Sequence, residues 1–313
     1  MNKENLIIEK VIDSVSNVII GKKDAITDIM KGIIAGGHIL IEDVPGVGKT
    51  TLIKALSKSL SLSYSRIQFT PDLLPSDITG ISIYNQKDME FQFKKGPIFS
   101  NVVLADEINR TSPKTQSALL EVMEERQVSE GNHTYKLEKP FIVLATQNPV
   151  DYEGTFILPE AQLDRFVMKV KIGYPSKESE IDILDIYREE DPMDKIEPVA
   201  SGEDIIYLQK KVKEVKATRA INEYIVDIAN ITRDSQYITL GVSPRAALSL
   251  LRISQASALI KGRNYVIPED VKENMSLVLG HRIILSSLGK ANGYTEEDIL
   301  QDLIKRVSVP KVG

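Results

Sequence analysis

The stretch His38–Leu52, HILIEDVPGVGKTTL, constrains the fold of this chain more than any other. Its apolar start predicts a buried parallel strand, and the one-sided apolar pattern from Thr50 onward predicts a helix. Gly46 and Gly48 let the backbone between them curl, so that successive N–H groups form an anion nest at the helix N-terminus. Lys49 can then reach phosphates, and the Thr50 hydroxyl suits phosphate-bound Mg²⁺. We identify this stretch as a P-loop, which predicts a nucleoside triphosphate as the ligand.

The P-loop departs from the strict pattern G-x-x-x-x-G-K-[ST] at one position. Asp43 stands where that pattern has glycine. The flanking strand and helix are nevertheless of the types that the motif requires, so the prediction of a nucleotide site stands. The residues expected to contact the nucleotide here are Pro45, Gly46, Val47, Gly48, Lys49, Thr50 and Thr51.

Length and composition exclude several classes of protein. The 313 residues suffice for two domains, and a formal net charge of −5 disfavours strong binding of nucleic acid. No apolar run approaches the ~20 residues of a membrane span, and charged residues interrupt the N-terminal sequence MNKENLIIEK where a signal peptide is apolar. The chain has no cysteine, which excludes disulfides, thiolate zinc sites and a cysteine nucleophile. These features predict a cytoplasmic protein without a membrane span.

Two neighbouring carboxylates follow the buried strand predicted at Asn101–Ala105. Asp106 and Glu107 thus lie at the C-terminal end of a parallel strand, where open α/β sheets bind ligands. We expect Asp106 to hold Mg²⁺ together with Thr50, and Glu107 to polarise the water that attacks the γ-phosphate. A third apolar strand ends just before Asn148, whose amide can orient the same water. The alternative for Asn148 is a turn-forming Asn-Pro pair.

A loop ahead of the P-loop has two interpretations. Helices are predicted at Leu6–Ser16 and Lys23–Ala35, and an apolar loop that includes Ile20 and Gly21 joins them. This loop either walls an adenine base or belongs to ordinary core packing.

Two segments between the strands predict β-hairpins. The segment from about 70 to 97 is read as an insertion, with a turn of helix followed by alternating apolar and polar residues around Asn85–Asp88. Gln127–Leu137 alternates in the same way around a central glycine. The first hairpin is either a partner-contacting element or a decorated surface loop.

The pattern beyond Gly173-Tyr174-Pro175 is purely helical. We therefore expect an α/β core at 1–175 and a C-terminal helical lid domain at 176–313. The three histidines lie far apart in the sequence, so a histidine metal site is not expected. Helices are predicted at Lys177–Arg188, Glu203–Val212, Ala220–Ser235, Pro244–Lys261 and Pro268–Leu279.

The order and wording of the motifs resemble the MoxR family of AAA+ ATPases. The resemblance is carried by EDVPGVGKT, ADEINRTSPKTQSALLEVMEER and ATQNPVDYEGTFILPEAQLDRF, and it runs from about Ile19 through the C-terminal region. It implies an α/β P-loop NTPase (AAA+) fold: a three-layer core with a parallel five-stranded sheet, inserted β-hairpins and a C-terminal all-helical lid. It also implies that an acidic residue at Asp43 is tolerated.

The resemblance further implies roles for individual residues. Asn148 matches the first sensor, and Arg165 in LDRF matches the arginine finger that reaches the γ-phosphate of a neighbouring subunit. Arg245 in GVSPR is similar to the second sensor, and Arg110 is a further candidate for an interfacial arginine. The alternatives are a salt-bridged arginine at a helix end for Arg165 and a solvent-facing arginine in the first helical turn for Arg245.

The resemblance implies a Mg²⁺-dependent ATP hydrolase that assembles into a homo-oligomer, a hexameric ring, and remodels or matures partner proteins in a chaperone-like manner. A partner with a von Willebrand factor A domain is implied, whose metal site the ATPase helps to load. The alternatives are a motor subunit of a magnesium-chelatase-like complex, a helicase-type motor, and a nucleotide-gated scaffold with little turnover. The acidic charge disfavours the helicase, and the presence of Glu107, Asn148 and Arg165 disfavours the scaffold. The client protein is not evident from the sequence.

Overall fold

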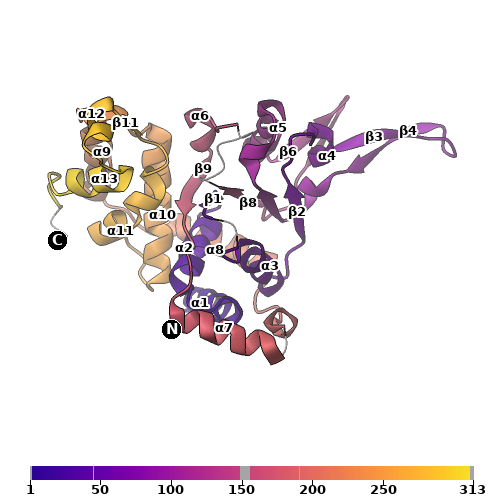
Figure 1. Cartoon of the computed structure of the whole chain (residues 1–313), viewed down its shortest axis with the longest axis horizontal. Coiled ribbons are helices and arrows are strands. Elements are labelled where there is room, and N and C mark those ends of the chain that lie inside the picture. The colour runs from indigo at the N-terminus through magenta and orange to yellow at the C-terminus, as the bar shows by residue number, and fades with distance from the viewer. Residues whose placement is uncertain (1, 45, 149–155, 190, 311–313) are drawn as a thin grey trace.

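A parallel sheet of five strands forms the centre of the protein (Figure 1). The structure, a computed structural model, describes residues 2–44, 46–148, 156–189 and 191–310. The strand order is β2-β5-β8-β1-β9, and every neighbouring pair is parallel. The predicted five-stranded parallel sheet is therefore confirmed. Its strands are β1 (His38–Glu42), β2 (Tyr64–Gln68), β5 (Val102–Asp106), β8 (Ile142–Gln147) and β9 (Phe166–Val170).

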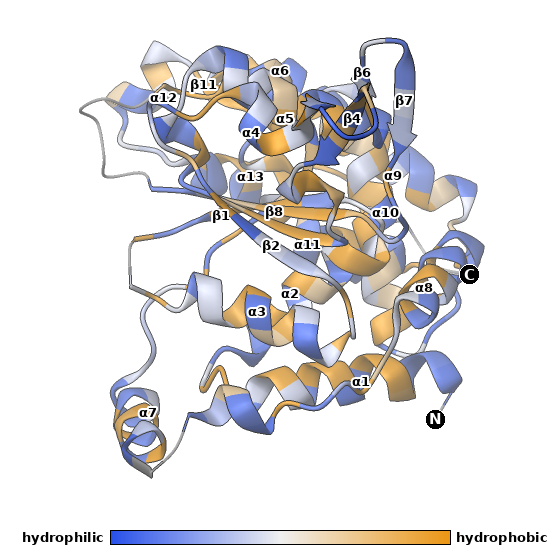
Figure 2. Ribbon diagram, turned by 90° about the vertical axis from the view of Figure 1, so that its right-hand side faces the viewer, coloured by the Kyte–Doolittle hydropathy of each residue, from blue (hydrophilic) through white to orange (hydrophobic). Residues whose placement is uncertain are grey.

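Helices cover both faces of this sheet, which makes the core three-layered (Figure 2). Strand residues alternate between the faces, so that Leu104 packs toward α1, α2 and α3, whereas Val103 packs toward α5. The central strands β1, β5 and β8 are buried on both faces, which explains why they are apolar along most of their length. The covering helices are α1 (Lys3–Ser16), α2 (Lys23–Ile34) and α3 (Lys49–Ser59) on one side and α5 (Pro113–Glu125) on the other.

Both predicted hairpins are present, and they contact each other. The Phe93 ring stacks on the Tyr135 ring with centroids 4.4 Å apart. The first hairpin projects from the core (Figure 1) and exposes Ile83, Met89 and Phe91. These elements are α4 (Pro75–Thr79), β3 (Gly80–Asn85) and β4 (Glu90–Lys95), and then β6 (Gln127–Glu130) and β7 (His133–Lys136); short 3₁₀ turns lie at Pro97–Phe99 and Ile108–Arg110.

The C-terminal helices pack beside β9 and not over the P-loop. Helix α10 contacts α2 and α8, and α11 contacts β9, so the lid shares a continuous hydrophobic core with the α1–α2 layer. Arg282 secures this contact, because its guanidinium donates to the Phe166 carbonyl at 2.6 Å. The lid helices are α8 (Gly202–Glu214), α9 (Arg219–Arg233), α10 (Pro244–Ile260), α11 (Pro268–Leu279), α12 (Ser287–Ala291) and α13 (Glu296–Ile304).

The helical lid is confirmed, with one addition that its apolar periodicity did not predict. Two short strands, β10 (Ile238–Leu240) and β11 (Ile284–Leu285), pair in an antiparallel manner within it. Segments of two and three residues are too short to show an alternating pattern.

Helix α7 (Lys177–Glu189) lies near α1 and apart from the other lid helices (Figure 1). A 3₁₀ turn (Pro192–Lys195) follows it, and a four-residue helix, α6 (Glu160–Leu163), precedes β9. The domain boundary predicted at residues 175 and 176 falls just before α7, and it stays a prediction.

His38, the first residue of β1, is a buried neutral imidazole. The Val143 N–H donates to its Nδ1 at 2.9 Å, so its Nε2–H is left to donate to the Met123 carbonyl at 3.0 Å. Burial is the main reason that the pKa of His38 is lowered to about 4; the hydrogen bond to Met123 opposes this shift and the charge of Arg126 adds to it. Burial also lowers the pKa of His281 well below its ordinary value.

We expect the free energy of unfolding to decrease as the pH falls from about 6.5 to about 4. In this interval the unfolded chain binds a proton at His38 and the folded chain does not, so stability present above pH 6.5 is lost on acidification. The loss for His38 alone should be about 3 kcal/mol. Urea unfolding at several pH values measures it. His38→Gln should make the free energy of unfolding depend less on pH, and the exposed control His133→Gln should not. If the free energy of unfolding of His38→Gln changes with pH as much as that of the wild type, His38 is not the source of the pH dependence.

Candidate functional site

A pocket of about 460 Å³ lies where β1, β2, β5 and β8 end at the C-terminal edge of the sheet. All of its lining residues except Arg66 and Gln68 are predicted as site residues from the sequence. We call it the P-loop pocket. It is lined by Gly46, Gly48, Lys49, Thr50, Thr51, Arg66, Gln68, Asp106, Glu107 and Asn148.

The P-loop has the curled backbone that the sequence predicts. Gly46 and Gly48 have φ angles of +87° and +83°, which L residues rarely adopt, and α3 begins at Lys49 directly afterwards. The Lys49 ammonium donates to the carbonyls of Asp43 and Val44 at 2.8 and 3.2 Å. The Val47 side chain packs into the hydrophobic core and does not line the pocket. Pro45, also predicted to contact nucleotide, lies outside the described residues.

Asp43, the departure from the strict motif, has a structural function. Its buried carboxylate accepts hydrogen bonds from the backbone N–H groups of Val44, Ile172 and Gly173, at 2.9, 2.7 and 2.5 Å. Lys22 also holds the segment around Gly173, because its ammonium donates to the Ile172 and Tyr174 carbonyls at 2.8 and 2.6 Å. Glycine at position 43 could not connect the P-loop to the segment that leads from β9 into α7.

We expect Asp43→Ala to lower the free energy of unfolding by about 2–3 kcal/mol, because it leaves buried N–H groups of Ile172 and Gly173 without an acceptor. Chemical denaturation measures the change. The control is Asp13→Ala, which removes an exposed ion pair with Lys23 and should cost less than about 1 kcal/mol. Equal effects of the two substitutions would contradict the structural function of Asp43.

The two carboxylates are held by residues of β2 and β8. Thr146 donates its hydroxyl to Asp106 at 2.6 Å, and the Arg66 guanidinium donates to the other oxygen of Asp106 at 2.6 and 3.1 Å. Gln68 donates its amide N–H to Glu107 at 2.9 Å. The sequence analysis missed Arg66 and Gln68. A pattern in the sequence could have identified them, because polar residues two positions apart at the end of a strand point to the same face of the sheet.

Glu107 has a strained backbone. Its φ and ψ of 57° and 50° lie in the left-handed region, which costs a non-glycine residue about 1–3 kcal/mol. The Thr146 hydroxyl, which accepts the Glu107 N–H at 2.8 Å, helps to hold this conformation. Arg110 lies 3.4 Å from the Glu107 carboxylate in the same chain. Strain maintained at a carboxylate in a pocket is typical of a functional residue.

The P-loop pocket offers hard oxygen ligands. The Thr50 hydroxyl and the buried Asp106 carboxylate line it together, whereas the described ranges contain no group of three or more histidine, aspartate or glutamate residues placed to hold a metal ion. Mg²⁺ binds through one or two carboxylates, waters and substrate phosphates, and needs no larger protein cage. The residues present therefore fit the Mg²⁺ expected with a nucleoside triphosphate.

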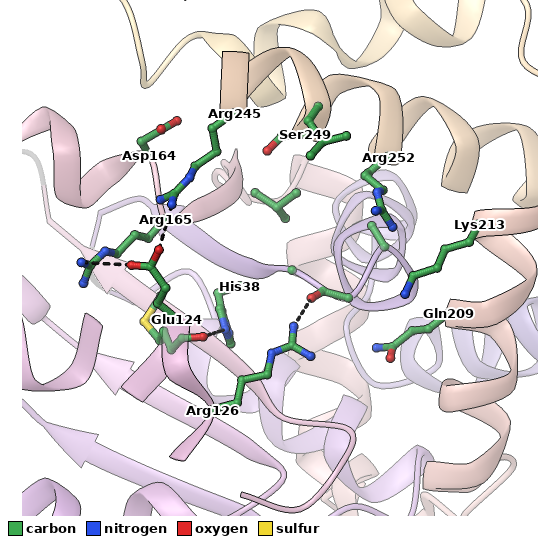
Figure 3. A pocket seen from close by; sticks show the side chains of 16 residues that line it. His38, Glu124, Arg126, Asp164, Arg165, Gln209, Lys213, Arg245, Ser249 and Arg252 are labelled. Atoms are coloured by element: carbon green, nitrogen blue, oxygen red, sulfur yellow. Dashed lines mark hydrogen bonds and ion pairs between the residues drawn. The ribbon is translucent and has the colours of Figure 1, made fainter. Parts of the chain in front are cut away.

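Arg165 and Arg245 lie together, and neither lines the P-loop pocket. Both bind Glu124, at 3.1 Å for Arg165 and 2.8 Å for Arg245 (Figure 3). They border a second cavity of about 480 Å³, beside the N-terminal ends of β1 and β9. We call this cavity the basic groove. Its basic side chains are Arg126, Arg165, Lys213, Arg245 and Arg252.

The two residues of the loop before α2 that could contact an adenine, Ile20 and Gly21, have different surroundings. Ile20 is half-buried, while the neighbouring Val18 belongs to the hydrophobic core. Gly21 has φ of +71°, and a Cβ added there would lie 2.2 Å from the Ser179 hydroxyl of α7. Neither Ile20 nor Gly21 lines the P-loop pocket, so their contact with an adenine stays a prediction.

Comparisons with known proteins decide the family. Residues 38–168 match the ATPase family associated with various cellular activities (AAA), and residues 230–303 match the AAA lid domain. Chaperone MoxR1 of Mycobacterium tuberculosis is 40% identical over 314 residues, which cover 97% of this chain and 83% of that protein. The chain belongs to the MoxR family of AAA+ ATPases.

Two further proteins are similar over nearly the whole chain, and one of them supports the fold. Uncharacterized protein YeaC of Bacillus subtilis is 50% identical over 97% of this chain and 95% of its own length. A crystal structure of a Cytophaga hutchinsonii protein superposes with a TM-score of 0.92 at 42% identity, covering 98% of this chain and 96% of that one. The MoxR resemblance seen in the sequence is thus confirmed. None of the helices within the described ranges is long and apolar enough to cross a membrane.

Proposed function

We propose that this MoxR-family ATPase hydrolyses Mg²⁺-ATP at sites shared between the subunits of a hexameric ring. The observation that carries this proposal is the separation of the predicted catalytic residues. The P-loop, Asp106, Glu107 and Asn148 lie at the C-terminal edge of the sheet, whereas Arg165 and Arg245 lie at the N-terminal edge. A site that contains all of these catalytic residues requires the N-terminal edge of the sheet in one subunit to face the C-terminal edge of the sheet in the next. Such a head-to-tail contact forms a ring when the rotation between neighbouring subunits closes, as the proposed hexamer requires.

Each residue of the P-loop pocket has a part in this reaction. The P-loop N–H groups and Lys49 bind the phosphates, and the Thr50 hydroxyl and Asp106 hold Mg²⁺. When bound, Mg²⁺ neutralises charge on the β- and γ-phosphates. Glu107 accepts a proton from the attacking water, which Asn148 helps to orient. Gln68 positions Glu107. Arg66 is paired with Asp106 and competes with Mg²⁺ for this carboxylate until Mg²⁺-ATP fills the pocket.

The arginines complete the site from the neighbouring subunit. Arg165 supplies positive charge to the γ-phosphate as negative charge develops in the transition state. Arg245 acts beside it, because both guanidinium groups converge on Glu124. Within its own subunit the lid carries Arg245 away from the P-loop pocket, so we assign both arginines to the neighbour's nucleotide.

A dilution series tests the shared site. ATP turnover per subunit should fall as the protein is diluted below the concentration at which rings form, because a lone subunit lacks the arginines at its own nucleotide. Mass photometry on the same samples reports the oligomeric state. Constant turnover per subunit in samples that contain only monomers would overturn the proposal.

The cellular role that we propose is chaperone-like maturation of a partner protein in the cytoplasm. One relative bears the name Chaperone MoxR1, and the family resemblance implies a von Willebrand factor A domain partner whose metal site is loaded. The projecting hairpin β3–β4, with exposed Met89 and Phe91, offers a contact surface for such a partner.

Co-purification from the native cell tests this role. The Glu107→Gln variant should bind ATP without hydrolysing it and should retain the partner protein. The double variant Lys49→Ala, Glu107→Gln should not bind ATP and should retain less of the partner protein. A von Willebrand factor A domain protein enriched only with the first variant supports the proposal. Equal recovery with both variants would contradict nucleotide-dependent partner binding.

A further inference from the structure

Helix α7 presents an apolar surface that the described part of the chain leaves open. Leu184 is 73% exposed, Ile181 is 51% exposed and Tyr187 is 45% exposed. Their spacing of three residues places them along one side of the helix. No residue from Lys177 to Arg188 is fully buried, and Figure 2 shows α7 outside the packed helices of the core. A contiguous exposed apolar surface marks an interaction site.

The polar residues of α7 are mostly acidic. From Lys177 to Arg188 the sequence contains four acidic and two basic residues, and all four carboxylates are exposed. The surface that would cover α7 should therefore combine an apolar patch with positive charge.

The basic groove has this combination. Five basic residues line it against two acidic ones, Glu124 and Asp164. Lys213 and Arg252 at one end form no hydrogen bond or ion pair with any residue that the structure describes, and Figure 3 shows both lining the groove. Leu248, which lies on the same face of α10 as Arg252, is 52% exposed and supplies apolar surface.

Helix α7 and the basic groove lie at opposite edges of the sheet. The α7 side is tied to the P-loop, because Asp43 and Lys22 bind the segment that leads into the helix and Ser179 contacts Gly21. The groove begins at Arg165, beside the N-terminal ends of the strands, and extends to Lys213 of α8. In a head-to-tail ring these two edges face each other.

We propose that α7 of one subunit docks in the basic groove of the next subunit, a second copy of this chain. The apolar side of α7 covers Leu248, and its carboxylates pair with Lys213 and Arg252. This inference rests on the ring of the proposed function, and it explains how Arg165, in the same groove, is aligned with the neighbour's P-loop pocket.

Substituting the apolar side of α7 should weaken assembly. With ATP present, Leu184→Ser should raise the subunit concentration at half assembly about tenfold or more, as expected for the loss of one buried leucine. The matched control is Val226→Ser, since Val226 is 50% exposed on α9 and does not line the groove. Mass photometry measures assembly, and circular dichroism confirms that both variants are folded.

Substituting the groove should have the same effect. Arg252→Glu places a negative charge opposite the acidic helix, so it should also raise the concentration at half assembly, and this effect should shrink in high salt. The matched control is Arg219→Glu on α9, which exchanges an exposed arginine outside the groove.

Cross-linking tests the contact directly, because the natural chain has no cysteine. Leu184→Cys subunits mixed with Leu248→Cys subunits should form a covalent dimer with a short bismaleimide in the presence of ATP, and Val226→Cys subunits mixed with the same partner should not. If wild-type rings form but the first pair does not cross-link and Leu184→Ser assembles normally, the docking is wrong and the ring stands. If the wild type never forms rings with ATP, both proposals fall.

Discussion

Arg165→Ala is expected to lower ATP turnover by about 10³- to 10⁵-fold while ATP binding stays unchanged. The reason is that Arg165 lies outside the P-loop pocket of its own chain and faces a neighbour's γ-phosphate in the proposed ring. Removing its charge leaves the transition state without a compensating cation, yet it removes no ligand of the subunit's own nucleotide. Steady-state turnover and equilibrium binding of a fluorescent ATP analogue measure the two effects separately.

A mixing experiment shows in which subunit Arg165 acts. Subunits with Arg165→Ala keep Glu107, and subunits with Glu107→Gln keep Arg165, so some interfaces in a mixed ring contain both. Turnover should then exceed the sum of the two separate proteins, provided that subunit exchange is confirmed first. Arg219→Ala, a substitution of an exposed arginine on α9, serves as the control that leaves turnover unchanged. Turnover that never exceeds the sum at any mixing ratio would mean that Arg165 does not act between subunits.

Glu107→Gln is expected to lower hydrolysis by about 10²-fold or more with ATP binding retained. The amide has the shape of the carboxylate but cannot accept the proton of the attacking water, and Gln68 loses its charged acceptor. Single-turnover hydrolysis, measured with ATP in place, isolates this step from binding.

Lys49→Ala separates binding from chemistry in the same pocket. Lys49 is the P-loop cation, so its loss should abolish ATP binding and, as a consequence, turnover. Glu107→Gln should instead bind ATP as tightly as the wild type. Equal loss of binding in the two variants would mean that Glu107 is a ligand of the nucleotide and not a general base.

Local patterns in the sequence determined the core of the fold. Burial on both faces made β1, β5 and β8 continuous apolar runs, and the one-sided patterns of α1, α2 and α3 identified their buried faces. Lys49, Thr50, Asp106, Glu107 and Asn148 could be grouped before the structure was known. Each lies at or just after the carboxyl end of a parallel strand, and these ends meet at one edge of the sheet.

Only the tertiary structure decided how residues outside these motifs are placed. Arg66 and Gln68 reach the carboxylates because β2 is the neighbour of β5, and strand order is not encoded in any local pattern. Glu124 joins Arg165 to Arg245 across 121 residues from α5 to α10, a contact that depends on how the lid packs. The exposure of α7 likewise arises because the lid packs beside β9 and leaves that helix uncovered. Periodicity identifies the apolar side of a helix, but only the arrangement of the whole chain determines whether another element covers it.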